Sequence, residues 1–193
     1  MWNHFTSRNA VAFATGGFVA ALFLAGAAHA ITDTIFKYST PKTGSYGISP
    51  LGFVPGDNQA ADGYAFVIAG GFQSLQLSNG HTNGCFDTGV NLPQGATITA
   101  FTMWYSTDTN DGVDTSLVRA KLSDGTDDVL ATIESTNANQ VRKSQTKTIS
   151  NSAIATVNNN QYVYTVAVCL SSQNLLSRYF AGRITYTYAT AGD

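Results

Sequence analysis

Short runs of Val, Ile, Thr, Tyr and Phe alternate with polar residues along most of this chain, and clusters of Gly, Asn, Asp and Pro separate the runs. A two-residue repeat of β-branched and aromatic side chains is typical of strands that bury one face. Helix signals are nearly absent: no long stretch of Leu, Ala, Glu and Lys repeats at 3.6 residues, and Glu134 is the single Glu. The pattern therefore predicts an all-β protein.

About ten short segments have this strand character. They are Thr34–Tyr38, Leu51–Val54, Gly63–Ile68, Phe72–Leu77, Thr97–Tyr105, Thr115–Leu122, Val129–Ser135, Ser144–Ile149, Tyr162–Leu170 and Tyr179–Tyr188. So many short antiparallel strands favour a jelly-roll-like β-sandwich over a closed barrel. The polar segment Ser39–Ser49 is expected to be a loose arm. In the last strand, strict alternation places Phe180 on one face and Tyr179 on the opposite, wetter face.

The first thirty residues have the three-part layout of a secretory signal peptide. Met1–Arg8 is polar and carries one arginine, Val11–Ala27 is apolar, and Ala28-His29-Ala30 has the small-x-small pattern of a cleavage site. We predict cleavage after Ala30, which leaves residues 31–193 as a single secreted domain, extracellular or periplasmic. The alternative is a membrane anchor, but the apolar run is short for a span and contains three glycines. No later stretch could cross a membrane.

The two cysteines, Cys85 and Cys169, both belong to the predicted secreted domain. In an oxidising compartment a lone pair of cysteines is more often a disulfide than two free thiols. The sequence therefore predicts a Cys85–Cys169 bridge. The alternative is that Cys169 is a small apolar side chain within a strand.

Charge excludes one class of partner. Only 11% of the residues are charged and the formal net charge is −2. No basic patch large enough to hold a phosphate backbone is visible, so nucleic-acid binding is not expected.

Four stretches together resemble a recurring type of small secreted bacterial β-sandwich protein. Val90–Ile98 resembles its Leu-Pro-x-Gly-Ala element, and Leu117–Arg119 resembles its central strand. Val157–Asn159, followed by Tyr162–Tyr164, resembles its third element, and Arg183–Tyr186 its closing strand. The resemblance implies a secreted β-sandwich. It does not point to any particular activity. Within the first element, Pro93 presets φ and Gly95 tolerates a positive φ, which predicts a defined turn.

A search for catalytic groups finds little. His81, the one histidine of the predicted secreted domain, lies in a Gly- and Asn-rich loop, where an exposed turn residue is the ordinary interpretation. The chain has no G-x-S-x-G element and no His and Cys residues at zinc spacing. Most aspartates fall in turns, where their side chains cap the backbone. We predict no catalytic residue and no enzyme activity.

An acidic loop is the single candidate for a metal site. Asp108, Asn110, Asp111 and Asp114 place three carboxylates and an amide within seven residues. Calcium takes six to eight oxygen ligands from loops of this composition, although the glycine spacing differs from that of an EF-hand. The alternative is a solvated acidic turn between strands. No other cofactor is expected.

Aromatic residues give the last clue. Trp104 points away from Met103 and Tyr105 on a strand, so one side of this strand can face the core and the other the surface. The alternative is that the aromatics fill the interior. Three functions remain: a secreted non-catalytic protein that acts by surface contacts (adhesion, matrix or structural assembly), a carbohydrate-binding module, or a hydrolase. The first is favoured by low charge and many Ser, Thr, Asn and Tyr. The second would show exposed aromatics on one sheet face, and the third a deep pocket at His81. The partners expected are a surface glycan or a second copy of the chain in self-association.

Overall fold

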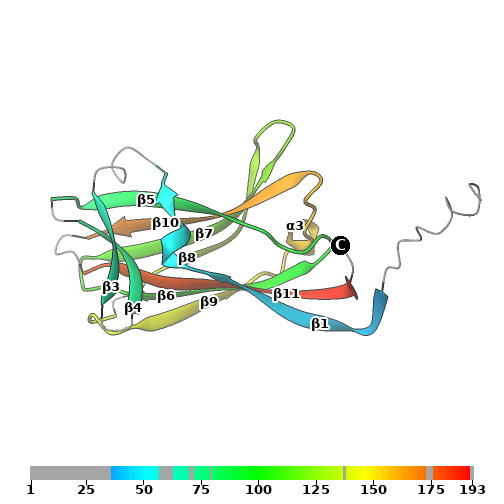
Figure 1. Cartoon of the computed structure of the whole chain (residues 1–193), viewed down its shortest axis with the longest axis horizontal. Helices are drawn as coiled ribbons and strands as arrows, with labels where there is room; N and C mark the ends of the chain where they lie inside the picture. Colours follow the sequence, from blue (N-terminus) through cyan, green and yellow to red (C-terminus); the bar gives the residue numbers. More distant parts are fainter. Residues whose placement is uncertain are drawn as a thin grey trace, which may run out of the picture. The chain divides into compact units, whose positions relative to one another are not determined.

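The computed structural model describes residues 36–56, 63–69, 72–78, 80–136, 138–172 and 176–191 (Figure 1). Lys37–Ala191 belong to one compact unit. The predicted leader, residues 1–30, lies outside the described residues. The strands are β1 (Phe36–Ile48), β2 (Val54–Pro55), β3 (Tyr64–Ala69), β4 (Phe72–Leu77), β5 (Asn83–Val90), β6 (Thr97–Ser106), β7 (Gly112–Lys121), β8 (Asp127–Glu134), β9 (Lys143–Thr148), β10 (Tyr162–Ser171) and β11 (Arg178–Ala191). A 3-10 turn, η1 (Pro50–Gly52), and a short helix, α3 (Ser152–Ala155), complete the described elements. Within these ranges no helix has the length and apolar character needed to cross a membrane.

The strands from β4 to β11 form a jelly roll, which confirms the predicted fold class. They pair as one long antiparallel hairpin: β7 with β8, β6 with β9, β5 with β10, and β4 with β11. The hairpin is rolled up so that β10 also pairs with β7, and β11 also pairs with β6. The result is two sheets. Sheet A has the order β3-β4-β11-β6-β9, with β1 added beside β11, and sheet B has the order β2-β5-β10-β7-β8.

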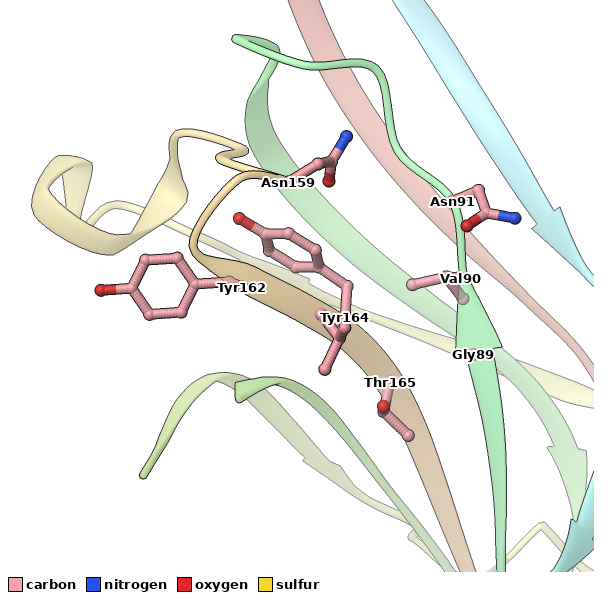
Figure 2. A pocket seen from close by; sticks show the side chains of 8 residues that line it. Gly89, Val90, Asn91, Asn159, Tyr162, Tyr164 and Thr165 are labelled. Carbon is pink, nitrogen blue, oxygen red and sulfur yellow. The ribbon is translucent and has the colours of Figure 1, made fainter. Parts of the chain in front are cut away.

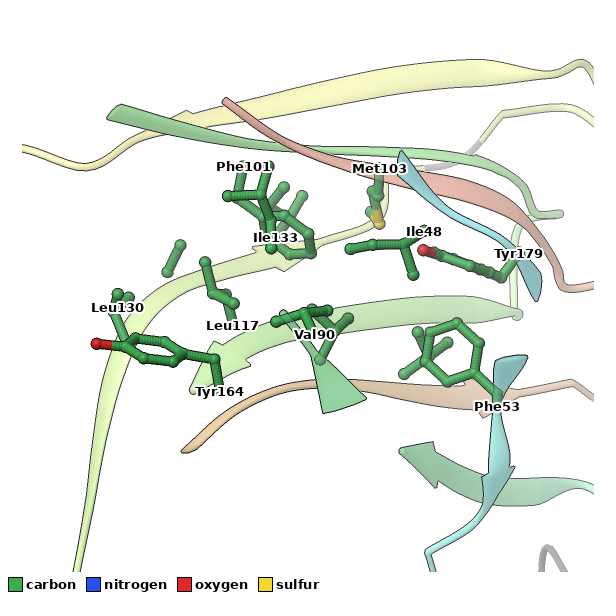
Figure 3. Close-up of a cluster of buried hydrophobic side chains, with 14 of the residues drawn as sticks. Ile48, Phe53, Val90, Phe101, Met103, Leu117, Leu130, Ile133, Tyr164 and Tyr179 are labelled. Atoms are coloured by element: carbon green, nitrogen blue, oxygen red, sulfur yellow. The ribbon is translucent and has the colours of Figure 1, made fainter. Parts of the chain in front are cut away.

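Apolar side chains from both sheets meet in one buried core (Figure 3). The largest fully buried side chains are Tyr105, Tyr179, Phe86, Phe101, Leu75, Leu77, Ile98, Met103, Leu117, Leu170, Ile184 and Val113. On β10 the predicted alternation is confirmed, because Tyr164, Val166, Val168 and Leu170 are buried. Each such side chain contributes about 1.5–3 kcal/mol when it is removed from water. The core therefore supplies the main stabilisation of the sandwich.

The prediction for β11 was wrong at its first residues because the strand contains a bulge. Tyr179 pairs with Tyr105, while Ala181 pairs with Trp104, so Phe180 is an extra residue. An extra residue shifts the alternation of side chains by one position. Tyr179 is therefore completely buried, with its hydroxyl against Gly182. Burial raises the pKa of Tyr179 well above its usual range.

Three other segments differ from the prediction. The predicted strand Leu51–Val54 is mostly the 3-10 turn η1, and only Val54 belongs to β2. The expected loose arm, Ser39–Ser49, is mostly strand, because β1 runs to Ile48 and pairs with β11. Strand β5 was not predicted, since Gly84, Asp87 and Gly89 interrupt its apolar pattern. The latter two segments become strands because a neighbouring strand satisfies their backbone hydrogen bonds.

The turn after Leu92 is bound to the segment before β10. Gly95 has φ +74° as the sequence predicted, and its N–H donates to the carbonyl of Val157 at 2.9 Å. Asn159 donates from its backbone to Oε1 of Gln94 at 2.7 Å and from its side chain to the carbonyl of Leu92 at 2.9 Å. Two of the four stretches that carry the resemblance therefore hold each other in place.

Arg119, from the second of those stretches, lies close by and is almost buried, with 8% exposure. Its Nε donates to Oδ2 of Asp128 at 2.8 Å, and one terminal nitrogen donates to the carbonyl of Ile154 at 3.1 Å. The guanidinium also lies 4.2 Å from the centre of the Tyr162 ring. These contacts give Arg119 a structural role that joins β7, β8 and the segment that leads to β10.

Candidate functional site

His81 has a packing role in the structure. Its ring lies against Gly63, where a Cβ atom would overlap it, and its backbone N–H donates to the carbonyl of Ser78 at 3.2 Å. Neither of the two surface cavities described below is lined by His81.

The carboxylates of the acidic loop accept hydrogen bonds from within the protein. Asp108 accepts hydrogen bonds from Thr109, and Asp111 accepts one from Ser172 Oγ at 3.1 Å. Asp114 lies on β7, where Oδ1 accepts from the N–H of Ser135 at 3.4 Å. Asn110 is exposed. Among the described residues no three His, Cys, Asp or Glu side chains gather as metal ligands.

We therefore expect millimolar calcium to leave the melting temperature unchanged. An ion bound only by the native state would stabilise it by about 2.7 kcal/mol at one hundred times its dissociation constant. Differential scanning fluorimetry with calcium and with chelator tests this. A rise in melting temperature that chelator reverses and Asp111→Asn removes would establish a calcium site instead.

The Cys85–Cys169 disulfide is confirmed. The two residues lie directly opposite each other on β5 and β10, with their Cα atoms 4.0 Å apart. Their neighbours Phe86 and Val168 face the core, so the bridge lies on the outer face of sheet B, where both cysteines are partly exposed. The disulfide fixes the register of these two strands across the outer face.

A surface cavity of about 420 Å³ lies beside β5 and β10 (Figure 2). It is lined by Gly89, Val90, Asn91, Asn159, Tyr162, Val163, Tyr164 and Thr165. Several polar groups of its wall already serve the fold, because the Asn159 side chain holds Leu92 and the Tyr164 hydroxyl accepts from the N–H of Asn158 at 2.9 Å. A second cavity of about 320 Å³ is lined by Lys121, Leu122, Ser123, Asn160 and Gln161. Neither lining contains a carboxylate.

The outer face of sheet A is better equipped to bind a ligand. Trp104 on β6 is partly exposed, whereas Met103 and Tyr105 beside it are fully buried, as the alternation predicts. The guanidinium of Arg183, on the neighbouring strand β11, lies 5.3 Å from the centre of the Trp104 ring. Arg183 itself is exposed. This pair places an indole face and a cation side by side at the surface.

The bulge in β11 adds a second aromatic residue to the same face. Because both Tyr179 and Gly182 face the core, two residues between them, Phe180 and Ala181, fall on the outer side. Phe180 is partly exposed, and the guanidinium of Arg142 lies 5.0 Å from its ring centre. Arg178 is exposed and precedes the buried Tyr179, so it lies on the same outer side, opposite Ser106 of β6. We call the group formed by Trp104, Phe180, Arg142, Arg178 and Arg183 the Trp104 face.

Hydroxyl groups continue the Trp104 face toward β9. Trp104 pairs with Ser144, and Thr102 pairs with Thr146, whose hydroxyl lies 2.8 Å from that of Thr102. Ser144 and Thr146 are exposed. The face therefore offers aromatic carbon, guanidinium donors and hydroxyl groups that can both donate and accept.

Sequence reasoning singled out Trp104 but missed the other members of its face. Phe180 was assigned to the opposite side of its strand, since the bulge leaves no signal in the alternation of this segment. Arg142 directly precedes β9 in sequence. Strand β9 pairs with β6, which pairs with β11, and this strand order brings Arg142 to Phe180. Arg183 could be assigned to an outer face from the pattern, but its aromatic neighbour could not.

Comparisons with known proteins give remote matches to solved structures. No family model matches the chain, and no curated protein matches it. A solved structure described as the xylan-binding module CBM15 is 8% identical, has a TM-score of 0.42, and covers 80% of this chain and 97% of its own. A non-crystalline cellulose specific carbohydrate-binding module, CBM28, is 12% identical with a TM-score of 0.40, covering 76% of this chain and 89% of its own. A structure of infectious bursal disease virus, Gx strain, is 10% identical with a TM-score of 0.39, covering 79% of this chain and 33% of its own. With TM-scores below 0.5, these likenesses are no basis for assigning a function to this chain.

Proposed function

We propose that this chain is an exported, non-catalytic glycan-binding protein whose ligand lies on the Trp104 face. The observation that carries the proposal is that the partly exposed Trp104 and Phe180 lie on the same outer face, each with a guanidinium group over its ring. The predicted leader and the disulfide support export, because disulfides persist in oxidising compartments. Binding of a glycan at a cell surface or matrix is a particular case of the surface-contact function that the sequence favours.

The chemistry of the Trp104 face suits a sugar ring. The axial C–H groups of a pyranose form an apolar patch that can pack on an indole, while its hydroxyls need hydrogen-bond partners around the rim. Arg183, Ser144 and Thr146 supply such partners from β11 and β9. Arg183 covers the indole in this structure, but an exposed cation–π contact contributes only about 0.5–1 kcal/mol, so a ligand can displace it readily.

The distribution of titratable groups supports a role without catalysis. An active site gathers groups with perturbed pKa values in a cleft. Asp124 has its pKa held well below its usual range, chiefly by hydrogen bonds from Thr126 and Lys121, but it lies in the exposed β7–β8 turn. The hydrogen bonds that lower the pKa of Asp124 stabilise this turn.

Trp104→Ala is expected to weaken glycan binding by about 5- to 150-fold, if a sugar ring stacked on the indole contributes on the order of 1–3 kcal/mol, as nucleic-acid bases stacked on aromatic side chains do. A glycan array identifies the ligands of the natural chain, and isothermal titration calorimetry measures each variant with the best of them. Val129→Ala, which removes an exposed apolar side chain from sheet B, is the matched control and should bind normally. Binding by Trp104→Ala that equals the control would remove the Trp104 face from consideration.

A further inference from the structure

We propose that the glycan bound by the Trp104 face is acidic, a polysaccharide that carries carboxylate groups such as a polyuronate. This inference rests on the proposed function and specifies its ligand class. It is based on the separation of basic and acidic residues between the two sheets. It is also based on the arginines of the Trp104 face, which are exposed and form no ion pair with a described residue.

The strands of sheet A contain basic residues and no acidic ones. The basic residues are Lys37, Lys42, Lys143, Lys147, Arg178 and Arg183, and Arg142 directly precedes β9. The strands of sheet B and the turn between β7 and β8 carry the opposite excess, with Asp87, Asp114, Asp124, Asp127, Asp128 and Glu134. A small net charge of −2 therefore conceals two outer faces of opposite sign.

The basic residues of the two sheets also differ in their partners. In sheet B, Arg119 pairs with Asp128 and Lys121 pairs with Asp124, both with nitrogen–oxygen distances below 3 Å: 2.8 and 2.9 Å. Arg142, Arg178 and Arg183 are exposed, and the structure gives them no ion pair with any described residue. Three positive charges on the Trp104 face thus have no acidic neighbour on their own sheet.

The placement of two guanidinium groups favours a carboxylate ligand. A guanidinium group beside the bound sugar can donate two N–H groups to one carboxylate in a bidentate pair. Hydrogen bonds of this charge-assisted kind are about twice as strong as neutral ones. A neutral sugar would leave the three positive charges without a counter-charge, whereas a uronate residue stacked on Trp104 can place its carboxylate beside Arg183.

A second copy of this chain is the competing occupant, since sheet B is acidic. Several of its carboxylates are already engaged, however: Asp128 by Arg119, Asp124 by Lys121, and Asp114 by the N–H of Ser135. The two aromatic side chains on the Trp104 face, Trp104 and Phe180, have a direct use with a sugar. The polysaccharide is therefore the better fit, and self-association becomes an outcome of the test.

The test compares polygalacturonate, polyglucuronate and polymannuronate, each with the same polymer after its carboxylates have been reduced to neutral hydroxymethyl groups. Affinity electrophoresis and calorimetry at low and moderate salt measure binding. We expect at least one acidic polymer to bind at least about tenfold more tightly than its neutral counterpart, with a preference that weakens as salt screens the charges. The double variant Arg142→Gln/Arg183→Gln should lose this preference, whereas Lys121→Gln, a basic residue of sheet B, should keep it.

Each other outcome has a distinct meaning. Equal binding of acidic and neutral polymers, lost in Trp104→Ala, would overturn the acidic ligand and leave glycan binding in place. Absence of binding to these polymers and to a broad glycan array would overturn both the acidic ligand and the proposed glycan-binding function. Sedimentation that shows an oligomer which Arg142→Gln/Arg183→Gln dissociates, without polysaccharide binding, would assign these arginines to self-association.

Discussion

Replacement of both Cys85 and Cys169 by alanine is expected to lower the free energy of unfolding by about 2–4 kcal/mol. The bridge joins residues separated by 84 positions. The chain-entropy model gives about 4–5 kcal/mol for a loop of this size, and residual structure in the unfolded chain reduces that figure. In a domain of this size, such a loss corresponds to a melting temperature lower by roughly 5–15 °C.

Urea unfolding of the oxidised protein, the reduced protein and the double variant measures this effect. The slope of the free energy against urea should increase when the bridge is absent, since the unfolded chain then exposes more surface. Thr132→Ala, which removes a hydroxyl from the outer face of the same sheet, should change stability by less than about 0.5 kcal/mol. Coincident unfolding curves for oxidised and reduced protein would contradict the prediction.

Arg119→Ala is expected to destabilise the fold by about 2–4 kcal/mol, because it removes a nearly buried side chain that three other groups contact. The carbonyl of Ile154 would lose its donor and the Tyr162 ring its cation. The Asp128 side chain is 46% exposed, so water can solvate its carboxylate when Arg119 is absent. The expected loss of stability is therefore at the lower end of the range for breaking a buried ion pair.

Two further substitutions separate the contributions of Arg119. Asp128→Asn should cost no more than about 1 kcal/mol, since it alters a half-exposed ion pair. Arg119→Lys keeps the charge but cannot reach Asp128 and Ile154 at once, so we expect an intermediate loss. A stability of Arg119→Lys equal to that of the natural chain would show that the planar guanidinium is not required.

The sequence alone determined the fold class, because alternation of apolar side chains is a local property that survives in most strands. The limits of β4 were predicted without error, and the buried face of β10 was assigned correctly. The disulfide could also be predicted, since only two cysteines were available. The turn at Gly95 followed from residue chemistry that acts within a few positions.

Only the tertiary structure determined that β5 and most of β1 are strands, and which residues meet on the Trp104 face. Strand β5 has weak strand character, and its pairing with β10 supplies what its own residues do not. The bulge at Phe180 depends on the fit of Tyr179 beneath Gly182, a contact inside the core that no local pattern reports. Arg142 meets Phe180 although the two are far apart in sequence, because strand order places β9 beside β6, next to β11. Alternation fixes which side of a strand a residue faces, but pairing between distant strands decides which residues become neighbours on that side.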